Sequence, residues 1–231
     1  MTDPQVQRLR RLDVCAVSDA LDKLQLTGVV TGLPQRSGAP GGMSRIAGRA
    51  VTMKVGPGTP PPGPPKHLGC TAIEASGADN VIVVEQRSGV EAGCWGGLLT
   101  LGAKVRGVAG VVADGPLRDV DEAIAYEFPI YSRSLTSRTA RTRVVELGTQ
   151  VPVTIGLVGG AAFGGEVVVN PGDYVLADRS AVIFISPDNI ERVLEAAEMI
   201  VAKEAAMAKA ILSGTPIGAV MGGNYEHMLE N

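Results

Sequence analysis

Apolar residues recur three or four positions apart in several segments of this chain, which is the spacing of one face of a helix. The segment 98–105 has such a face, and Gly107 follows it as a stop signal. Thr2-Asp3-Pro4 reads as a helix start, with proline at the first helical position. Further helices are predicted over residues 14–26, 67–76, 122–127 and 187–212.

The longest predicted helix, 187–212, closes the chain. Ser186 would cap it, Pro187 would occupy its first position and Gly214 would end it. At about 1.5 Å per residue it would span roughly 40 Å, which is longer than one compact domain needs. We therefore expect part of this helix to pack on a neighbouring subunit.

Continuous β-branched runs indicate strands that are buried on both faces of a sheet. The clearest are residues 80–85, NVIVVE, and 108–112, VAGVV. Other predicted strands cover residues 46–55, 129–131, 144–145, 151–157, 167–169, 174–177 and 181–185. Strands alternate with helices in the first half and dominate the second half, which predicts an α/β fold.

Glycine and proline mark the connections between these elements. The chain has 30 glycines and 15 prolines, which favours many short elements over a helical bundle. Residues 28–43 are predicted to be a turn-rich connection. Residues 56–65, GPGTPPPGPP, could be a polyproline ligand, but their structured flanks favour a stiff surface loop.

The length of 231 residues and an apolar content of 45% are sufficient for a substantial core. Aromatic residues make up only 3%, so Val, Leu, Ile and Ala must fill that core. The sequence shows neither an internal repeat nor a credible linker. We therefore predict one domain covering residues 1–231.

Charge and cysteine usage narrow the class of protein. The net charge is −3 with Lys and Arg scattered, which argues against nucleic acid as a partner. Neither a secretory signal nor an apolar run of about 18 residues is present, so we expect no membrane association and a cytoplasmic location. Cys15, Cys70 and Cys94 lack CxxC spacing, which argues against disulfides and a zinc site.

The stretch 96–122, GGLLTLGAKVRGVAGVVADGPLRDVDE, combines three local signals. A glycine pair opens the predicted helix, a buried strand follows, and Asp114-Gly115-Pro116 is predicted to turn the chain. The turn would deliver Arg118, Asp119, Asp121 and Glu122 beyond the carboxyl end of the strand. In open α/β sheets, ligands usually bind at that edge.

These residue types suit a small 2-oxo acid. The first amides of a helix bind anions, and Gly96-Gly97 would let a ligand approach that backbone closely. Arg118 offers a planar fork for a carboxylate. Asp119 is a hard oxygen donor of the kind that holds Mg²⁺ or Mn²⁺. The sequence therefore predicts a site in which amides and Arg118 bind the carboxylate and a metal meets the oxo group.

Other candidates compete for a role in this site. Lys104 could form a Schiff base, although a solvated lysine is the simpler interpretation. His67 and His227 have no metal-ligand spacing, so structural or surface roles are favoured. Trp95 could wall the pocket or serve packing alone. Cys94 beside it has no obvious base, which argues against a nucleophile.

Three segments closely resemble the RraA-like family: CAVSDALDKL near the start, WGGLLTLGAKVRGVAGVVADGPLRDVDE in the middle, and PGDYVLAD at 171–178. That family includes 4-hydroxy-4-methyl-2-oxoglutarate (4-carboxy-4-hydroxy-2-oxoadipate) aldolases and regulators of ribonuclease activity. The resemblance extends over nearly the whole chain. It implies a compact β/β/α sandwich of the swivelling-domain type, assembled as trimers or hexamers.

The resemblance also implies roles for individual residues. Pyruvate would lie against the amides of Gly96, Gly97, Leu98 and Leu99, Arg118 would contact the substrate, and Asp119 would hold the metal largely through waters. Glu204 of a neighbouring subunit is a further match. The implied reaction is a metal-dependent retro-aldol cleavage of a 4-hydroxy-2-oxo acid, with oxaloacetate decarboxylation in the same class.

One position departs from the family pattern. The aldolases have an acidic residue for proton transfer at the position of Gly97. Losing such a group typically costs about 10²–10⁴-fold in rate. Glu91 or His67 could supply the proton instead. The alternative function is a non-catalytic regulator that binds a ribonuclease or another protein.

Overall fold

A computed structural model describes residues 2–41, 45–64, 66–156 and 165–222 of the chain. Parts of the predicted segments 28–43, 56–65 and 151–157, and His227, lie outside the described residues. The helices are α1 (Pro4–Leu9), α2 (Val14–Lys23), α3 (Cys70–Glu74), α4 (Gly97–Val105), α5 (Val120–Ala125), α6 (Ile190–Leu212) and α7 (Ile217–Val220). The strands are β1 (Val29–Val30), β2 (Gln35–Ser37), β3 (Ile46–Gly56), β4 (Asn80–Glu85), β5 (Gly110–Leu117), β6 (Ile130–Leu135), β7 (Val145–Thr149), β8 (Val153–Gly156), β9 (Glu166–Val169), β10 (Tyr174–Ala177) and β11 (Val182–Ile185).

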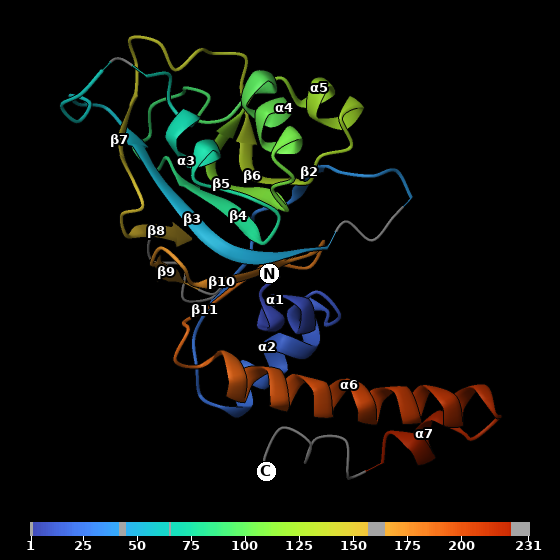
Figure 1. Ribbon diagram of the computed structural model, residues 1–231. Helices are drawn as coiled ribbons and strands as arrows, with labels where there is room; N and C mark the ends of the chain where they lie inside the picture. The colour runs from blue at the N-terminus through green and yellow to red at the C-terminus, as the bar shows by residue number, and fades with distance from the viewer. Residues whose placement is uncertain (1, 42–44, 65, 157–164, 223–231) are drawn as a thin grey trace.

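Nine of the described strands form one mixed sheet in the order β1-β11-β10-β3-β4-β5-β6-β2, with β7 paired to β3. Strands β3 to β6 run parallel, and their other neighbours pair antiparallel. Helices α3, α4 and α5 connect the parallel strands and cover one face (Figure 1). The small β8-β9 sheet packs on the opposite face. The expected α/β sandwich is confirmed.

The central strands are buried on both faces, as their apolar runs predict. In β4, Ile82 and Val84 pack under α3 and α4, whereas Val81 and Val83 face the β8-β9 side. This alternation follows from the two-residue period of a strand. A third cluster packs α1, α2 and α6 against β10 and β11. The helices α3–α5 and α6 therefore lie at opposite ends of the molecule (Figure 1).

The predicted turn at Asp114-Gly115-Pro116 is wrong, because all three residues belong to β5. The ladder between β5 and β6 shifts its register between Ala113 and Pro116, so a bulge accommodates the turn-forming residues inside the strand. Asp114 is 3% exposed, and its carboxylate accepts a hydrogen bond from Arg133 on β6. Tertiary contacts thus override the local turn signal.

Two other expectations need correction. The connection 28–43 contains the short strands β1 and β2, which pair with β11 and β6. Strands this short have too few residues to show a period. Ser186 does not cap α6, since Asn189 precedes the helix and donates its side-chain amide to the Ser186 hydroxyl. Pro187 lies in the turn before the helix.

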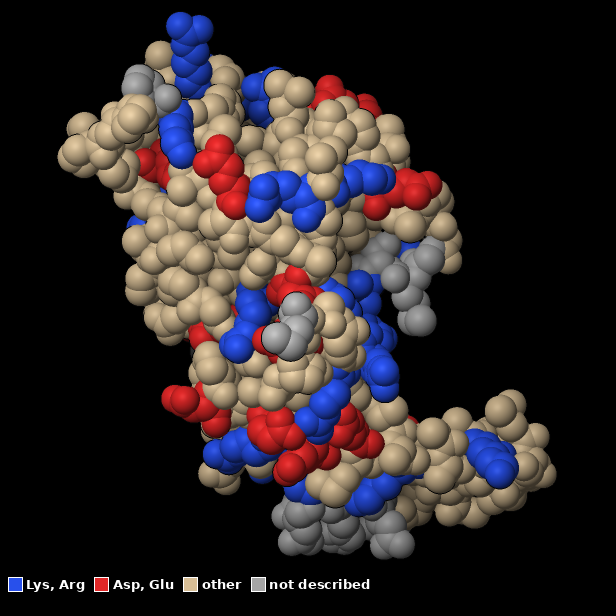
Figure 2. Space-filling model, viewed as in Figure 1, with Lys and Arg blue, Asp and Glu red and all other residues tan. Residues whose placement is uncertain are grey.

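The second half of α6 extends beyond the body of the molecule (Figure 1). Its buried residues end at Ile200, and Leu212 is 88% exposed. Packing of this half on a neighbouring subunit stays a prediction. No described helix is long and apolar enough to cross a membrane. In Figure 2, acidic and basic side chains lie next to one another on the visible face. Among the ion pairs of the described residues, Arg8 pairs with Glu191 and Glu198.

Candidate functional site

The chain brings Gly96-Gly97 beside Arg118-Asp119 through backbone pairing. Trp95 forms a parallel bridge with Leu117, and the Trp95 carbonyl accepts the amide of Arg118 at 3.0 Å. The first turn of α4 and the end of β5 are thereby held side by side. Both follow the carboxyl ends of the parallel strands β4 and β5, the sheet edge at which ligands usually bind.

The amino terminus of α4 presents backbone donors to this edge. The Gly97 amide donates to Oδ2 of Asp119 at 3.0 Å, and the Thr100 amide donates to the Gly96 carbonyl. The amides of Leu98 and Leu99 have no acceptor among the described residues. Because the helix dipole is positive here, these two N–H groups are suited to an anion.

Arg118 and Asp119 lie directly over this backbone. The aliphatic stem of Arg118 lies so close to Gly93 and Gly96 that a Cβ on either glycine would meet it at 3.0 and 3.1 Å. Its Nε donates to Oδ1 of Asp119 at 3.2 Å. The side chains of Arg118 and Asp119 are 36% and 32% exposed. The remaining guanidinium N–H groups have no acceptor in the described part of the chain, so they are open to a carboxylate.

Asp119 has a left-handed backbone, with φ of 57° and ψ of 41°. Aspartate tolerates this conformation better than most residues, because its short polar side chain bonds locally. The turn reverses the chain between β5 and α5 and aims the carboxylate at Gly97. Backbone conformations of this kind gather at functional sites.

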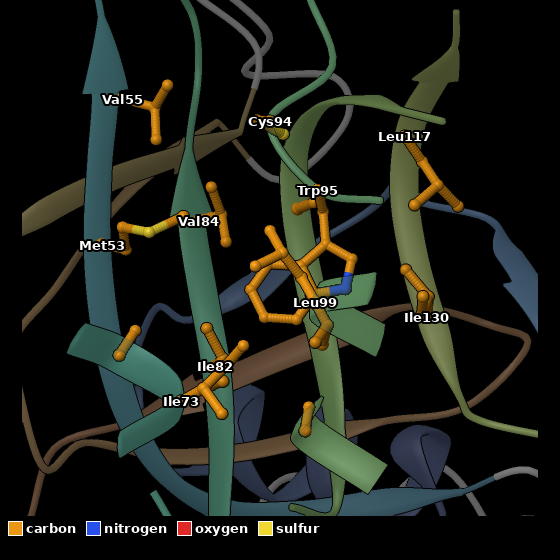
Figure 3. Close-up of a cluster of buried hydrophobic side chains, with 14 of the residues drawn as sticks. Met53, Val55, Ile73, Ile82, Val84, Cys94, Trp95, Leu99, Leu117 and Ile130 are labelled. Atoms are coloured by element: carbon orange, nitrogen blue, oxygen red, sulfur yellow. The ribbon is translucent and has the colours of Figure 1, made fainter. Parts of the chain in front are cut away.

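A pocket of about 610 Å³ opens beside these residues. Its lining includes the predicted set Gly96, Gly97, Leu98, Leu99, Arg118 and Asp119, together with His67, Cys70, Trp95 and Thr139. Trp95 both lines the pocket and packs in the core, at 1% exposure (Figure 3). Its Nε1 donates to the Thr100 hydroxyl at 3.1 Å, which fixes the indole under α4. The two interpretations of Trp95 thus both hold.

The other candidate residues lie at different distances from the pocket. Lys104 donates to the carbonyl of Tyr126 and does not line the pocket, so the Schiff-base interpretation gains no support. His67 is exposed and lines the pocket. Glu91 pairs with Arg138 at 2.9 Å and is not among the residues that line the pocket. Of the two proposed proton donors, only His67 is therefore close to the site.

Glu204 lies on α6, at the end of the molecule opposite the pocket (Figure 1). Burial and the charges of Asp13 and Asp19 raise the pKa of its carboxyl. Glu204 could reach a site only on another subunit, and this role stays a prediction.

The metal prediction rests on a single side chain. No group of three or more His, Cys, Asp or Glu residues is arranged to hold a metal in the described ranges. Mg²⁺ usually keeps several waters and needs only one or two carboxylates. Asp119 is partly exposed at the pocket, and each of its oxygens accepts one hydrogen bond from the residues that the structure describes. The donor set fits a largely hydrated divalent cation and does not fit a closed protein cage.

Glu122 was given no role from the sequence, but the structure brings its carboxylate against Gly97, which lines the pocket, although Glu122 is not itself among the lining residues. A Cβ on Gly97 would lie 1.8 Å from Oε2 of Glu122 and 3.3 Å from Cβ of Asp119. The carboxylate of Glu122 thus occupies the space that a side chain at position 97 would fill. The three-residue spacing of Asp119 and Glu122, which puts both on one side of a helix start, is the signal that could have identified it.

All three cysteines are free, as expected. Burial raises the pKa of the Cys94 thiol to about 12, whereas Cys15 is exposed. Because the thiolate is the reactive form, iodoacetamide at about pH 8 should modify Cys15 and leave Cys94 unmodified in the native protein. Peptide mass spectrometry would measure this, with urea-unfolded protein as the control in which both react. Modification of native Cys94 at the rate of Cys15 would contradict the burial.

The chain resembles known proteins over most of its length. A chain from Halalkalibacterium halodurans named "Putative 4-hydroxy-4-methyl-2-oxoglutarate aldolase" is 29% identical over 210 residues, covering 89% of this chain and 88% of that one. An uncharacterized protein from Pseudomonas syringae has a similar structure, with a TM-score of 0.77, 25% identity and coverage of 94% and 96%. RraAS2 of Streptomyces coelicolor, described as an unusual member of the RNase ES inhibitor RraA protein family, superposes with a TM-score of 0.69 at 23% identity, covering 88% and 96%.

The sequence model of the family described as "RraA-like: Aldolase/RraA" matches residues 14–184. The match includes the pocket and the helices and strands that build it. It agrees with the resemblance that the glycine pair and the Arg118-Asp119 turn indicated from sequence. The chain therefore belongs to the RraA-like family.

Proposed function

We propose that the protein is a divalent-metal-dependent lyase that cleaves a small 4-hydroxy-2-oxo acid to pyruvate or a similar product. The observation that carries this proposal is that Arg118 and Asp119 line one pocket with Leu98 and Leu99, whose amides have no acceptor among the described residues. The name of the Halalkalibacterium halodurans relative points to the same class of reaction. Decarboxylation of oxaloacetate belongs to this class because it releases the same enolate.

Each residue has a part in this chemistry. The amides of Leu98 and Leu99 bind the substrate carboxylate at the positive end of α4. Arg118 donates its free N–H groups to the same carboxylate or to the oxo group, where negative charge develops as the C3–C4 bond breaks. Trp95 keeps water from the floor of the pocket. Asp119 holds the backbone of Gly97 in place and would hold the cation.

A bound Mg²⁺ or Mn²⁺ would supply Lewis-acid stabilisation of the developing enolate charge. The partly exposed carboxylate of Asp119 leaves room for the waters that these cations retain. Glu204 from a neighbouring subunit is proposed to approach the same cation, within a homotrimer or hexamer. The projecting half of α6 supports such an assembly, because Ile211 and Leu212 near its end are exposed apolar residues.

Replacing Arg118 by Ala tests the proposal. Pyruvate release from a panel of 4-hydroxy-2-oxo acids in the presence of Mg²⁺ should fall about 10²-fold in kcat/KM, because an electrostatic donor to the transition state is lost. Arg118→Lys should be intermediate, since it keeps the charge and loses the planar fork. The assay couples pyruvate to lactate dehydrogenase. Metal-independent release, or equal activity of both variants and wild type, would contradict the proposal.

A second candidate function is a non-catalytic contact with a ribonuclease or another protein. One observation favours it: Leu98 and Val105 on α4 are 84% and 79% exposed and form an apolar stripe on its outer face. A charged substitution at the end of the stripe away from the pocket, Val105→Glu, would test it in a pulldown with a purified ribonuclease. Unchanged retention of the nuclease would count against the contact, and loss of retention with activity preserved would favour it.

A further inference from the structure

Glu122 holds a carboxylate against the α-carbon of Gly97, in the first turn of α4. The side chain that would be built on Gly97 starts 1.8 Å from Oε2 and 2.8 Å from Cδ of Glu122. Real Cβ atoms essentially never lie this close to another atom, so one of the two groups must move. Because Glu122 is exposed and its carboxylate is the flexible end of the side chain, a Cβ on Gly97 would displace that carboxylate from its present position.

Glycine at position 97 leaves space for the Glu122 carboxylate, and the backbone conformation at this position does not require glycine. Gly97 is the first residue of α4 and is not among the glycines with positive φ, so its backbone conformation does not call for glycine. What glycine provides here is room. The turn at Asp119 fixes the start of α5, and the first turn of α5 then delivers Glu122 to that room.

The charge of Glu122 has no partner in the described part of the chain, whereas the two carboxylates that line the pocket are paired. Asp119 bonds to Arg118 and to the Gly97 amide, and Glu74 pairs with Lys66. For Glu122 the structure shows no ion pair and no side-chain hydrogen bond among the described residues. An accessible carboxylate without a partner, held beside free amide donors, can accept a proton from a bound ligand.

From this geometry we infer that Glu122 is the proton-transfer residue of the site, an inference that rests on the proposed lyase function. The Glu122 carboxylate takes the proton of the C4 hydroxyl, directly or through one water. The electron pair of the broken O–H bond forms the C4 carbonyl of one product, while the C3–C4 pair passes to the enolate of the other. The same carboxyl then returns the proton to C3, which gives pyruvate and leaves Glu122 ionised, so neither an oxidant nor a co-reactant is needed.

The return of a proton to C3 can be measured without the unknown part of the substrate. With pyruvate alone as the probe, in D₂O with Mg²⁺, the reverse of this step exchanges the methyl protons for deuterium, which proton NMR records. Saturation-transfer NMR on the same samples reports pyruvate binding separately. Glu122→Gln should lower the exchange rate about 10²-fold while pyruvate binding is retained, because only the base is lost.

Two sets of variants exploit the displacement of the Glu122 carboxylate by a side chain at position 97. Gly97→Ala should also lower the rate of deuterium exchange, because the new Cβ displaces the Glu122 carboxylate. In the Glu122→Ala background, Gly97→Ala should lower the exchange rate no further, because there is no carboxylate left to displace. Gly97→Asp in the Glu122→Ala background returns a carboxylate to the same space and should recover at least about ten-fold of the lost rate. Asp121→Asn, an exposed neighbour on α5 with the same change of charge, is the control and should exchange at the wild-type rate.

The results distinguish a failure of the Glu122 assignment from a failure of the lyase proposal. If wild type exchanges and Glu122→Gln is equally fast, the assignment of Glu122 is overturned and the lyase proposal stands. If the wild-type protein neither binds pyruvate nor exchanges its protons, the lyase proposal fails and the assignment falls with it. Thermal unfolding of each variant shows whether a lost rate reflects lost folding, and the rescue by Gly97→Asp distinguishes proton transfer from a structural role.

Discussion

Replacing Asp114 by Ala should lower the free energy of unfolding by about 3–5 kcal/mol, because a buried charge pair loses one partner. Asp114 is 3% exposed in the middle of β5. Oδ1 accepts from Nε of Arg133 at 2.8 Å, and Oδ2 accepts from the Gly156 amide at 2.7 Å. Arg87 approaches Oδ2 at 3.7 Å. One carboxylate thus connects β5 to β6 and to β8.

Urea unfolding followed by circular dichroism would measure this loss. Asp114→Asn should cost less, because it keeps the volume and an acceptor for the Gly156 amide while losing the charge. Glu91→Ala is the matched control, since it breaks the exposed Arg138–Glu91 pair and should cost at most about 1 kcal/mol. A cost for Asp114→Ala no larger than that of Glu91→Ala would show that Asp114 does not hold the strands together.

Elements with long uniform runs were predictable from sequence. Residues 80–85 match β4 at both ends, because a buried β-branched run has few alternatives to a central strand. Residues 174–177 match β10 at both ends, because the Asn-Pro-Gly-Asp turn before them marks where the strand begins. The helix 98–105 matches α4 to within one residue, and glycines mark both of its ends. The pairing of Gly96-Gly97 with Arg118-Asp119 was also predictable. Successive parallel strands bring the residues after them to one edge of the sheet.

Contacts between distant residues decided what the sequence could not predict. Asp114-Gly115-Pro116 carries a strong turn signal, yet the arginines at 87 and 133 stabilise Asp114 inside β5. The strands β1 and β2 exist only because β11 and β6 offer partners. The role of Gly97 was hidden for the same reason. The effect of a glycine at position 97 depends on which residue fills the space of the absent side chain. That residue is Glu122, which lies on the next helix and is not adjacent in sequence.

The glycines of the pocket have a common function. Gly93 and Gly96 make room for the stem of Arg118, Gly96 also for Oδ2 of Asp119, and Gly97 for the carboxylate of Glu122. Each absent side chain therefore lets a charged group lie on the backbone at the start of α4. The glycine pair was predicted from the sequence to let a ligand approach the backbone. In the structure it first makes room for the protein's own charged side chains. The cation and the substrate would meet those side chains at the pocket.

Asp119 combines two tasks that different variants can separate. Its Oδ2 accepts from the Gly97 amide at 3.0 Å, and its negative charge faces the pocket beside Arg118. Asparagine keeps an acceptor for the Gly97 amide and tolerates the left-handed backbone with φ of 57°. Asp119→Asn thus removes the charge and retains the fold of the turn. Asp119→Ala removes both, and it also loses the tolerance for this conformation.

Asp119→Asn should therefore weaken Mn²⁺ binding at least about ten-fold and lower metal-dependent pyruvate release about 10³-fold, because a hard cation needs an ionised oxygen donor. Electron paramagnetic resonance of free Mn²⁺ measures the first effect independently of turnover, and the coupled assay measures the second. Asp121→Asn, on the same helix, should change neither. Asp119→Ala should add a loss of stability, since the Gly97 amide is left without its acceptor. Mn²⁺ bound equally by wild type and Asp119→Asn would remove Asp119 from the metal site and leave the amides and Arg118 as a binding site for the acid alone.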